Sequence, residues 1–129
     1  MPSIVLDASA ILAAIYSEDG AQKVRGLFAD PVSTILMSSL NWSEALDRLL
    51  RDGMRDDDAE SILASQNLEV VDFTIEQARI AARLRLAAPS LSLADRACLA
   101  LAKTRNATAW TTDKAWKKYS IPVAIELLR

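Results

Sequence analysis

Histidine is absent from this chain of 129 residues, and cysteine occurs only once. Without histidine there can be no Ser-His-Asp triad, no histidine-based nuclease and no histidine-ligated zinc, so metal-activated water is the natural nucleophile for a hydrolase. The single cysteine excludes a disulfide within the chain. Cys98 lies in an alanine- and leucine-rich segment, which predicts a buried apolar role rather than a reactive thiol.

Long apolar runs and a strong charge of one sign are also missing. No run approaches the ~20 residues of a membrane span, and the N-terminus lacks the basic start and cleavage site of a signal peptide, so we expect a cytoplasmic protein with no membrane partner. The net charge is −2, so the field of the whole molecule does not attract nucleic acid and any polyanion must be held locally. A length of 129 residues with 51% hydrophobic content predicts a single domain over residues 1–129.

Short aliphatic runs alternate with helical patterns along the chain. We expect strands at 3–6, 33–37, 70–71, 107–111 and 123–125, and helices at 8–16, 19–28, 39–51, 56–66, 75–86 and 93–103. This alternation favours a mainly parallel sheet covered on both faces, which is a three-layer α/β/α sandwich. In open sheets of this kind the site forms outside the carboxyl ends of the strands.

Four acidic residues occupy apolar surroundings at wide spacing: Asp7, Glu44, Asp95 and Asp113. An unpaired buried carboxylate costs several kcal/mol, so we expect these groups to share one metal site. Asp7 and Asp113 follow expected strand ends, where Ser9 and either Thr111 or Thr112 add hydroxyl groups. Oxygen ligands without histidine favour Mg²⁺ or Mn²⁺ over zinc.

Helix capping is the alternative explanation for each acid. It assigns Asp7 and Asp113 to N-caps, and it pairs Glu44 with Asn41 and Asp95 with Ser92 in capping boxes. Capping accounts for acids at helix starts. It does not explain why two of them directly follow strand ends beside serine or threonine.

Basic residues recur at helical spacing beside the second acid. One helix face is expected to carry Asn41, Glu44, Arg48, Arg51 and Arg55, and Lys114 directly follows the fourth acid. Such a stripe can track an RNA phosphate backbone. The alternative is a solvated face whose arginines pair with Asp47 and Asp52.

The order of these motifs resembles the PIN-domain ribonucleases, specifically the VapC toxins of bacterial toxin-antitoxin pairs, over essentially the whole chain. The motifs are Val5–Ala10 with Asp7 and Ser9, Ser39–Glu44, Leu91–Ala102 with Asp95, and Thr111–Trp116 with Asp113. The resemblance implies a PIN fold, Mg²⁺- or Mn²⁺-dependent RNA cleavage, a homodimer, and a cognate antitoxin whose C-terminal segment covers the site. Some relatives carry a further acid where this chain has Trp116, so one metal or two remains open.

In this interpretation the four acids hold the metal, and Ser9, Asn41 and Thr112 orient ligands or phosphate. We expect Trp42, Trp110 and Trp116 in the core or at an interface, and Leu86 with Leu84 near a dimer surface. A phosphatase of the haloacid-dehalogenase type requires a second acid where Ser9 stands. A catalytically silent PIN-like dimer that binds a partner remains the second alternative.

Overall fold

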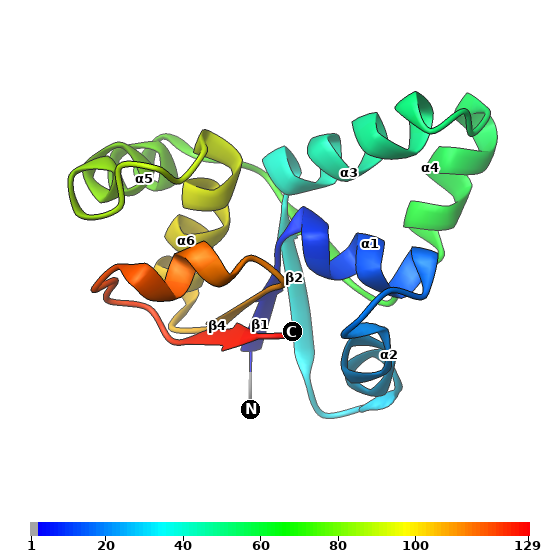
Figure 1. Cartoon of the computed structure of the whole chain (residues 1–129), viewed down its shortest axis with the longest axis horizontal. Coiled ribbons are helices and arrows are strands. Elements are labelled where there is room, and N and C mark those ends of the chain that lie inside the picture. The colour runs from blue at the N-terminus through cyan, green and yellow to red at the C-terminus, as the bar shows by residue number, and fades with distance from the viewer. Residues whose placement is uncertain (1–2) are drawn as a thin grey trace.

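The computed structural model describes residues 3–129, and within that range five strands form one sheet. They are β1 (Ser3–Leu6), β2 (Thr34–Ser38), β3 (Glu69–Val71), β4 (Thr108–Thr111) and β5 (Ile125–Leu127). Their order is β3-β2-β1-β4-β5, and every neighbouring pair is parallel, which confirms the expected sheet (Figure 1). The last strand begins two residues later than the expected range 123–125.

Helices cover both faces of the sheet, as the sequence predicts. One face carries α1 (Ala8–Tyr16), α2 (Ala21–Ala29), α3 (Ser39–Arg51) and α4 (Asp56–Ala64). The other carries α5 (Ile75–Ala87), α6 (Leu93–Arg105) and the short 3₁₀ helix η1 (Lys114–Lys118). The result is the three-layer α/β/α sandwich.

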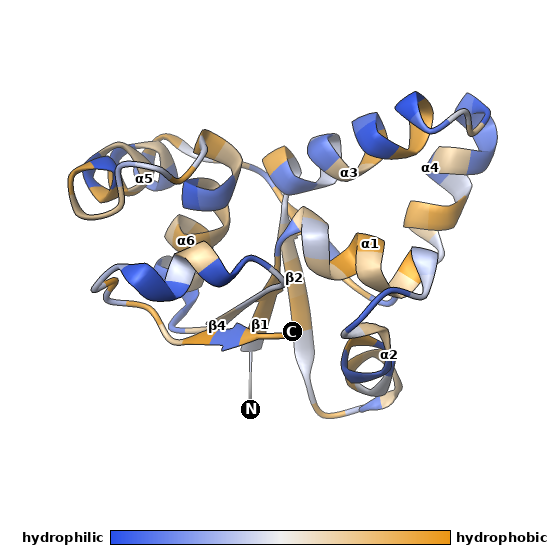
Figure 2. Ribbon diagram, viewed as in Figure 1, coloured by the Kyte–Doolittle hydropathy of each residue, from blue (hydrophilic) through white to orange (hydrophobic). Residues whose placement is uncertain are grey.

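Side-chain alternation in the central strands divides the core into two layers. Ile4 and Leu6 of β1 pack with α1 to α4, whereas Val5 points to the opposite face and packs with α6. In β2, Met37 and Leu36 divide in the same way. Because both faces are covered, the middle residues of these strands are hydrophobic without alternation, and Figure 2 shows hydrophobic residues along β1 and β2.

The aromatic residues serve the core. Trp116 is completely buried against α6, while Trp42 and Trp110 are partly buried against the core on the α1 side. Leu84 also lies in the core, so only Leu86, at 89% exposure, is free to contribute to a surface. Cys98 is fully buried, as expected. Within residues 3–129 no helix is both long and apolar enough to cross a bilayer.

Gly20 fixes the contact between the start of α2 and the chain after β5. It has a φ of +95°, and a β-carbon there would lie 2.9 Å from Leu128 Cβ. We expect Gly20→Ala to lower the free energy of unfolding by ~1–3 kcal/mol, because it adds left-handed strain to a steric clash. Urea denaturation measures this loss.

Gly26 is the matched control for this substitution. It lies within α2, and a β-carbon there would meet nothing within 4 Å. Gly26→Ala is expected to raise the free energy of unfolding by ~0.5–1 kcal/mol, because alanine loses less conformational freedom in a helix. Equal effects of the two substitutions would contradict the packing described at Gly20.

Candidate active site

The candidate site lies at the carboxyl edge of the sheet, between β1 and β4. After β1 the chain turns to α1 on one face, and after β4 it turns to η1 on the other. Such a switch point leaves a crevice at which ligands bind in open α/β sheets. Asp7 directly follows β1 and donates its backbone N–H to Trp110 O at 3.1 Å, and Asp113 lies two residues beyond β4. The first and fourth acids therefore flank this switch point.

Asp7 is the buried centre of the site, with only 3% of the residue exposed. Its Oδ1 accepts hydrogen bonds from Ser9 Oγ at 2.7 Å and from Ala10 N at 2.9 Å. Its Oδ2 accepts a hydrogen bond from Thr111 Oγ1 at 2.6 Å. These three bonds connect the end of β1, the first turn of α1 and the end of β4. They fix the orientation of the carboxylate.

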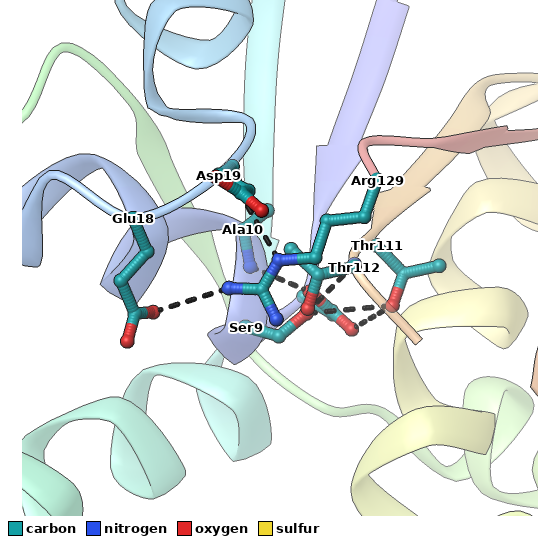
Figure 3. A network of polar contacts seen from close by, with 8 residues as sticks. Ser9, Ala10, Glu18, Asp19, Thr111, Thr112 and Arg129 are labelled. Carbon is teal, nitrogen blue, oxygen red and sulfur yellow. Dashed lines mark hydrogen bonds and ion pairs between the residues drawn. The ribbon is translucent and has the colours of Figure 1, made fainter. Parts of the chain in front are cut away.

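The hydroxyl groups beside Asp7 form the rest of this network (Figure 3). Ser9 Oγ accepts a hydrogen bond from the backbone N–H of Thr112 at 3.0 Å, as Figure 3 shows. Thr111 Oγ1 accepts one from the backbone N–H of Asp113, also at 3.0 Å. The hydroxyl that contacts Asp7 thus belongs to Thr111, whereas Thr112 contributes its backbone. Strand alternation explains why Thr111 is the one that contacts Asp7. Thr111 lies two residues after the buried Ala109, so its side chain is on the same side of the strand and is also buried.

Burial raises the pKa of Asp7 from its ordinary value of 3.8 to about 6. The hydrogen bonds from Thr111, Ser9 and Ala10 oppose this rise, and the negative charge of Asp95 adds to it. No basic side chain compensates this carboxylate within residues 3–129. A cation bound from solution can neutralise its charge.

Glu44 and Asp95 come from two helices that meet over the same edge. Asn41 of α3 is buried and donates its Nδ2 to Ala94 O of α6 at 3.0 Å, which connects the helices beside both acids. Asn41 Oδ1 is buried and has no hydrogen-bond partner within residues 3–129. The proposed capping box of Asn41 with Glu44 is wrong, because α3 begins at Ser39 and its N-cap is Ser38.

The remaining capping alternatives are confirmed. Asp7 and Asp113 are N-caps that accept backbone N–H groups, and Asp95 forms a capping box with Ser92. Capping does not exclude a role in a site, since each cap leaves lone pairs on its carboxylate free.

The expectation of four buried acids is wrong for two of them. Asp7 is buried and Asp95 is half-buried, but Glu44 and Asp113 are exposed. Glu44 is on α3 and lines a cleft together with Ser9 and Thr112, and Asp113 lies two residues beyond β4. Apolar neighbours in sequence therefore did not imply burial at these positions, because Glu44 is on a helix whose buried residues are Asn41, Ala45 and Leu49, and Asp113 lies beyond the end of β4.

The four acids influence one another electrostatically. Loss of solvent raises the pKa of Glu44, and the charge of Asp95 raises it further. Loss of solvent likewise raises the pKa of Asp95, to which the charge of Asp113 adds. The four ion pairs found within residues 3–129 include none of these carboxylates.

This donor set fits a hydrated divalent cation. As the side chains stand, no three acids in the described part of the chain converge closely enough to hold an ion among them. Mg²⁺ commonly keeps several waters and takes only one or two carboxylates, so close convergence is not required. Carboxylates whose pKa values are raised by loss of solvent and by a neighbouring negative charge, with oxygen as the donor type, match the chemistry of Mg²⁺ or Mn²⁺.

Two of the predicted RNA-contacting arginines pair with acids on their own helix. Arg48 Nε lies 3.0 Å from Asp52 Oδ2, and Arg51 Nε lies 2.8 Å from Asp47 Oδ2. These are the pairs that the solvated-face alternative predicts. Arg55 and Lys114, the other two candidates, are exposed at the starts of α4 and η1.

Arg48 nevertheless reaches a cleft beside the acids. This acidic-rim cleft has a volume of about 280 Å³ and is lined by Ser9, Leu12, Glu18, Glu44, Arg48, Thr112 and Arg129. Sequence reasoning did not identify Glu18 or Arg129 as part of it. No local motif marks either residue, because the register of β5 against β4 decides where Arg129 lies.

Comparison with known proteins identifies the family. The model of the PIN domain matches residues 4–122. No curated protein matches the sequence significantly. Among solved structures, a chain of the toxin-antitoxin complex from Klebsiella pneumoniae superposes with a TM-score of 0.76 at 17% identity, covering 98% of both chains.

Two further structures have the same fold. VapBC2 from Rickettsia felis, bound to a DNA fragment from its promoter, gives a TM-score of 0.74 at 22% identity, over 98% of this chain and 99% of that one. VapC20 from Mycobacterium tuberculosis, a sarcin-ricin loop cleaving toxin, gives 0.71 at 18% identity, over 89% and 93%. With the family model covering nearly the whole chain, the protein belongs to the PIN-domain family.

Proposed function

We propose that this protein is a metal-dependent endoribonuclease and the toxin of a toxin-antitoxin pair, acting in the cytoplasm. The observation that carries the proposal is the buried Asp7 carboxylate, which lacks a basic partner in residues 3–129 and lies beside three further acids at the switch point of a PIN fold. Such an arrangement is unfavourable in the empty protein and is relieved by a bound cation.

The cation, Mg²⁺ or Mn²⁺, would be held by Asp7, Glu44, Asp95 and Asp113. Bound there, it supplies charge neutralisation at the scissile phosphate and activation of the water nucleophile.

Neighbouring groups of the chain prepare these ligands. Ser9 and Thr111 hold the two oxygens of Asp7 in fixed directions through their hydroxyls. Asn41 joins α3 to α6 and so holds Glu44 near Asp95. Thr112 keeps Ser9 in place through its backbone N–H. These contacts reduce the reorganisation that a metal or phosphate would otherwise have to impose.

Partners follow from the similar structures. The complexes from Klebsiella and Rickettsia are toxin-antitoxin assemblies, which supports a cognate antitoxin for this chain, and the cleavage named for VapC20 supports RNA as the substrate. We also propose a homodimer, for which the exposed Leu86 on α5 offers apolar surface.

A phosphatase mechanism with Asp7 as nucleophile fits less well. Both oxygens of Asp7 accept hydrogen bonds, and the carboxylate is buried. A partner-binding dimer that keeps its acids for structure is the stronger alternative, since Asp7, Asp95 and Asp113 do cap helices.

Cleavage of a total small-RNA pool by antitoxin-free protein tests the proposal. We expect discrete fragments with Mn²⁺ or Mg²⁺ and none with chelator, and sequencing of the fragments identifies the target. Asp95→Asn keeps the capping geometry but removes a charge, so we expect it to lower cleavage on the order of a hundredfold. Cleavage that survives chelation would contradict the metal mechanism.

Thermal unfolding under Mn²⁺ titration separates the nuclease from the partner-binding alternative. The wild type should gain about 2.7 kcal/mol when free metal reaches about 100 times its Kd, and Asp95→Asn should gain much less at that concentration. Asp57→Asn, an exposed acid on the first turn of α4, is the control and should respond as the wild type does. A wild type that Mn²⁺ does not stabilise would favour the partner-binding dimer.

A further inference from the structure

Arg129 is brought to the candidate site by the pairing of β5 with β4. The ladder continues past β5, because Leu128 N donates to Thr111 O at 2.9 Å. The next residue, Arg129, therefore lies at the carboxyl edge beside Thr112, and both line the acidic-rim cleft. Gly20 leaves room for this path, since a β-carbon there would meet Leu128.

One side of the Arg129 guanidinium is held by the segment between α1 and α2. Nε donates to Asp19 O at 3.3 Å, and one terminal nitrogen lies 3.4 Å from Glu18 Oε1. The other terminal nitrogen makes neither contact. In Figure 3 the side chain extends from the end of β5 toward Ser9 and Thr112. A guanidinium carries five N–H donors, so most of its bonding capacity remains available.

The cleft offers a phosphate two cations and two hydroxyl groups. Arg129 and Arg48 line it together with Ser9 and Thr112, and the carboxylates of Glu18 and Glu44 line it as well. The ion pair of Arg129 with Glu18 is long and partly exposed, at 37% and 45% for the two side chains. Exposed pairs of this kind contribute little, so a phosphate can replace Glu18 at low cost.

We propose that Arg129 binds a phosphate of the RNA substrate in the acidic-rim cleft, which Arg48 also lines. The inference rests on the proposed nuclease function and names a contact for the same site. Because the molecule as a whole is acidic, a local cation at this place offsets the repulsion between the four acids and the RNA backbone. Arginine suits the task, since its planar fork binds phosphate through two parallel hydrogen bonds.

Binding of a labelled single-stranded oligoribonucleotide tests this role, with Ca²⁺ present and fluorescence anisotropy measured at several salt concentrations. Arg129→Ala is expected to weaken binding on the order of tenfold and to lower the slope of log K against log salt by about 1. Arg129→Lys should recover part of the affinity, because it restores the charge without the fork.

Lys23→Ala is the matched control. Lys23 Nζ pairs with Glu126 Oε1 of β5 at 3.3 Å, so Lys23→Ala, like Arg129→Ala, removes one positive charge and one exposed ion pair. Lys23 does not line the acidic-rim cleft. The RNA affinity of Lys23→Ala should stay within about twofold of that of the wild type, because the charge removed is remote from the bound phosphates.

Cleavage kinetics give a second readout. A contact made equally with substrate and transition state raises KM and leaves kcat nearly unchanged, which is the result expected of Arg129→Ala. Equal RNA affinities of Arg129→Ala and Lys23→Ala, while the wild type binds and cleaves, would overturn this inference alone. A folded wild type that binds no RNA would refute the nuclease proposal and this inference together.

Discussion

Asp7→Asn is expected to make the metal-free protein more stable at pH 7, by up to about 3 kcal/mol, while lowering RNA cleavage on the order of a hundredfold or more. The two effects have one cause. In the wild type the Asp7 carboxylate is desolvated and negatively charged at pH 7. This charge attracts a cation, and without a cation it destabilises the folded protein. Asparagine removes that charge and keeps the shape of the side chain.

The pH dependence of this gain follows from the pKa of Asp7. Burial raises it from 3.8 to about 6, so the folded protein retains a proton that the unfolded chain releases between these values. The stability contributed by protonated Asp7 is complete below about pH 4 and is lost as the pH rises through about 6. The difference between variant and wild type should therefore be small near pH 4 and reach its full size above about pH 7.

The hydrogen bonds of Asp7 tolerate asparagine. The amide oxygen can accept from Ser9 and Ala10, and the amide nitrogen can donate to Thr111 Oγ1. Urea denaturation at pH 4 and pH 7.5 measures the effect. Asp57→Asn serves as a control because this acid is exposed. A variant that is less stable than the wild type at neutral pH would show that the charge of Asp7 is compensated.

Trp116→Ala is expected to cost about 3–5 kcal/mol, the usual loss for a large aromatic residue in a core. Trp116 is completely buried on the face of the sheet that α6 covers. Removing it leaves a cavity beneath η1, the helix that Asp113 caps. We therefore expect the fourth acid to lose its fixed position, and cleavage to fall together with stability.

Trp116→Phe separates aromatic bulk from the indole N–H. Trp116 Nε1 is buried and has no hydrogen-bond partner among residues 3–129, so phenylalanine removes a desolvated donor without breaking a bond. Trp116→Phe should therefore lower the free energy of unfolding clearly less than Trp116→Ala does, which differential scanning calorimetry can measure. Equal losses for the two variants would indicate that Nε1 contributes a bond, for example to a buried water.

The same residue explains a feature of the sequence. Some PIN-domain proteins carry a further acid at the position of Trp116, but here that position belongs to the core. An acid there would be buried without a partner. On the proposed function, Asp113 would therefore serve as metal ligand without that further acid.

Local sequence patterns predicted helix boundaries well where a residue at the boundary itself causes it. The N-caps Thr74 and Ser92 start α5 and α6, and Gly53, with a φ of +96°, follows α3 as a helix-ending glycine does. The start of β5 was misplaced because Val123 and Ala124 are apolar, although the strand begins at Ile125 and Ala124 contributes only its carbonyl, which accepts from Ala109 N at 2.9 Å. That boundary depends on pairing with β4, which no residue of β5 encodes alone.

The sequence predicted where the acids after the strands lie better than it predicted how far each acid is buried. The positions of Asp7 and Asp113 after parallel strands placed them at one edge, as the structure shows. Burial could not be predicted in this way, since the exposure of Glu44 depends on the direction in which α3 leaves the sheet. The position of Arg129 at the site could not be predicted, because it depends on the register of β5 against β4.

The order of the strands also has a consequence for synthesis. β1 is central, but its neighbour β4 arrives only after the chain has built β2, β3 and both helices of the opposite layer. Asp7 and Asp113 therefore meet only when β4 docks, and a growing chain on the ribosome carries the first three acids without the fourth. On the proposed function, a cell that makes this protein is exposed to a complete cleavage centre only once nearly the whole domain has emerged, which leaves an interval for a waiting antitoxin to bind.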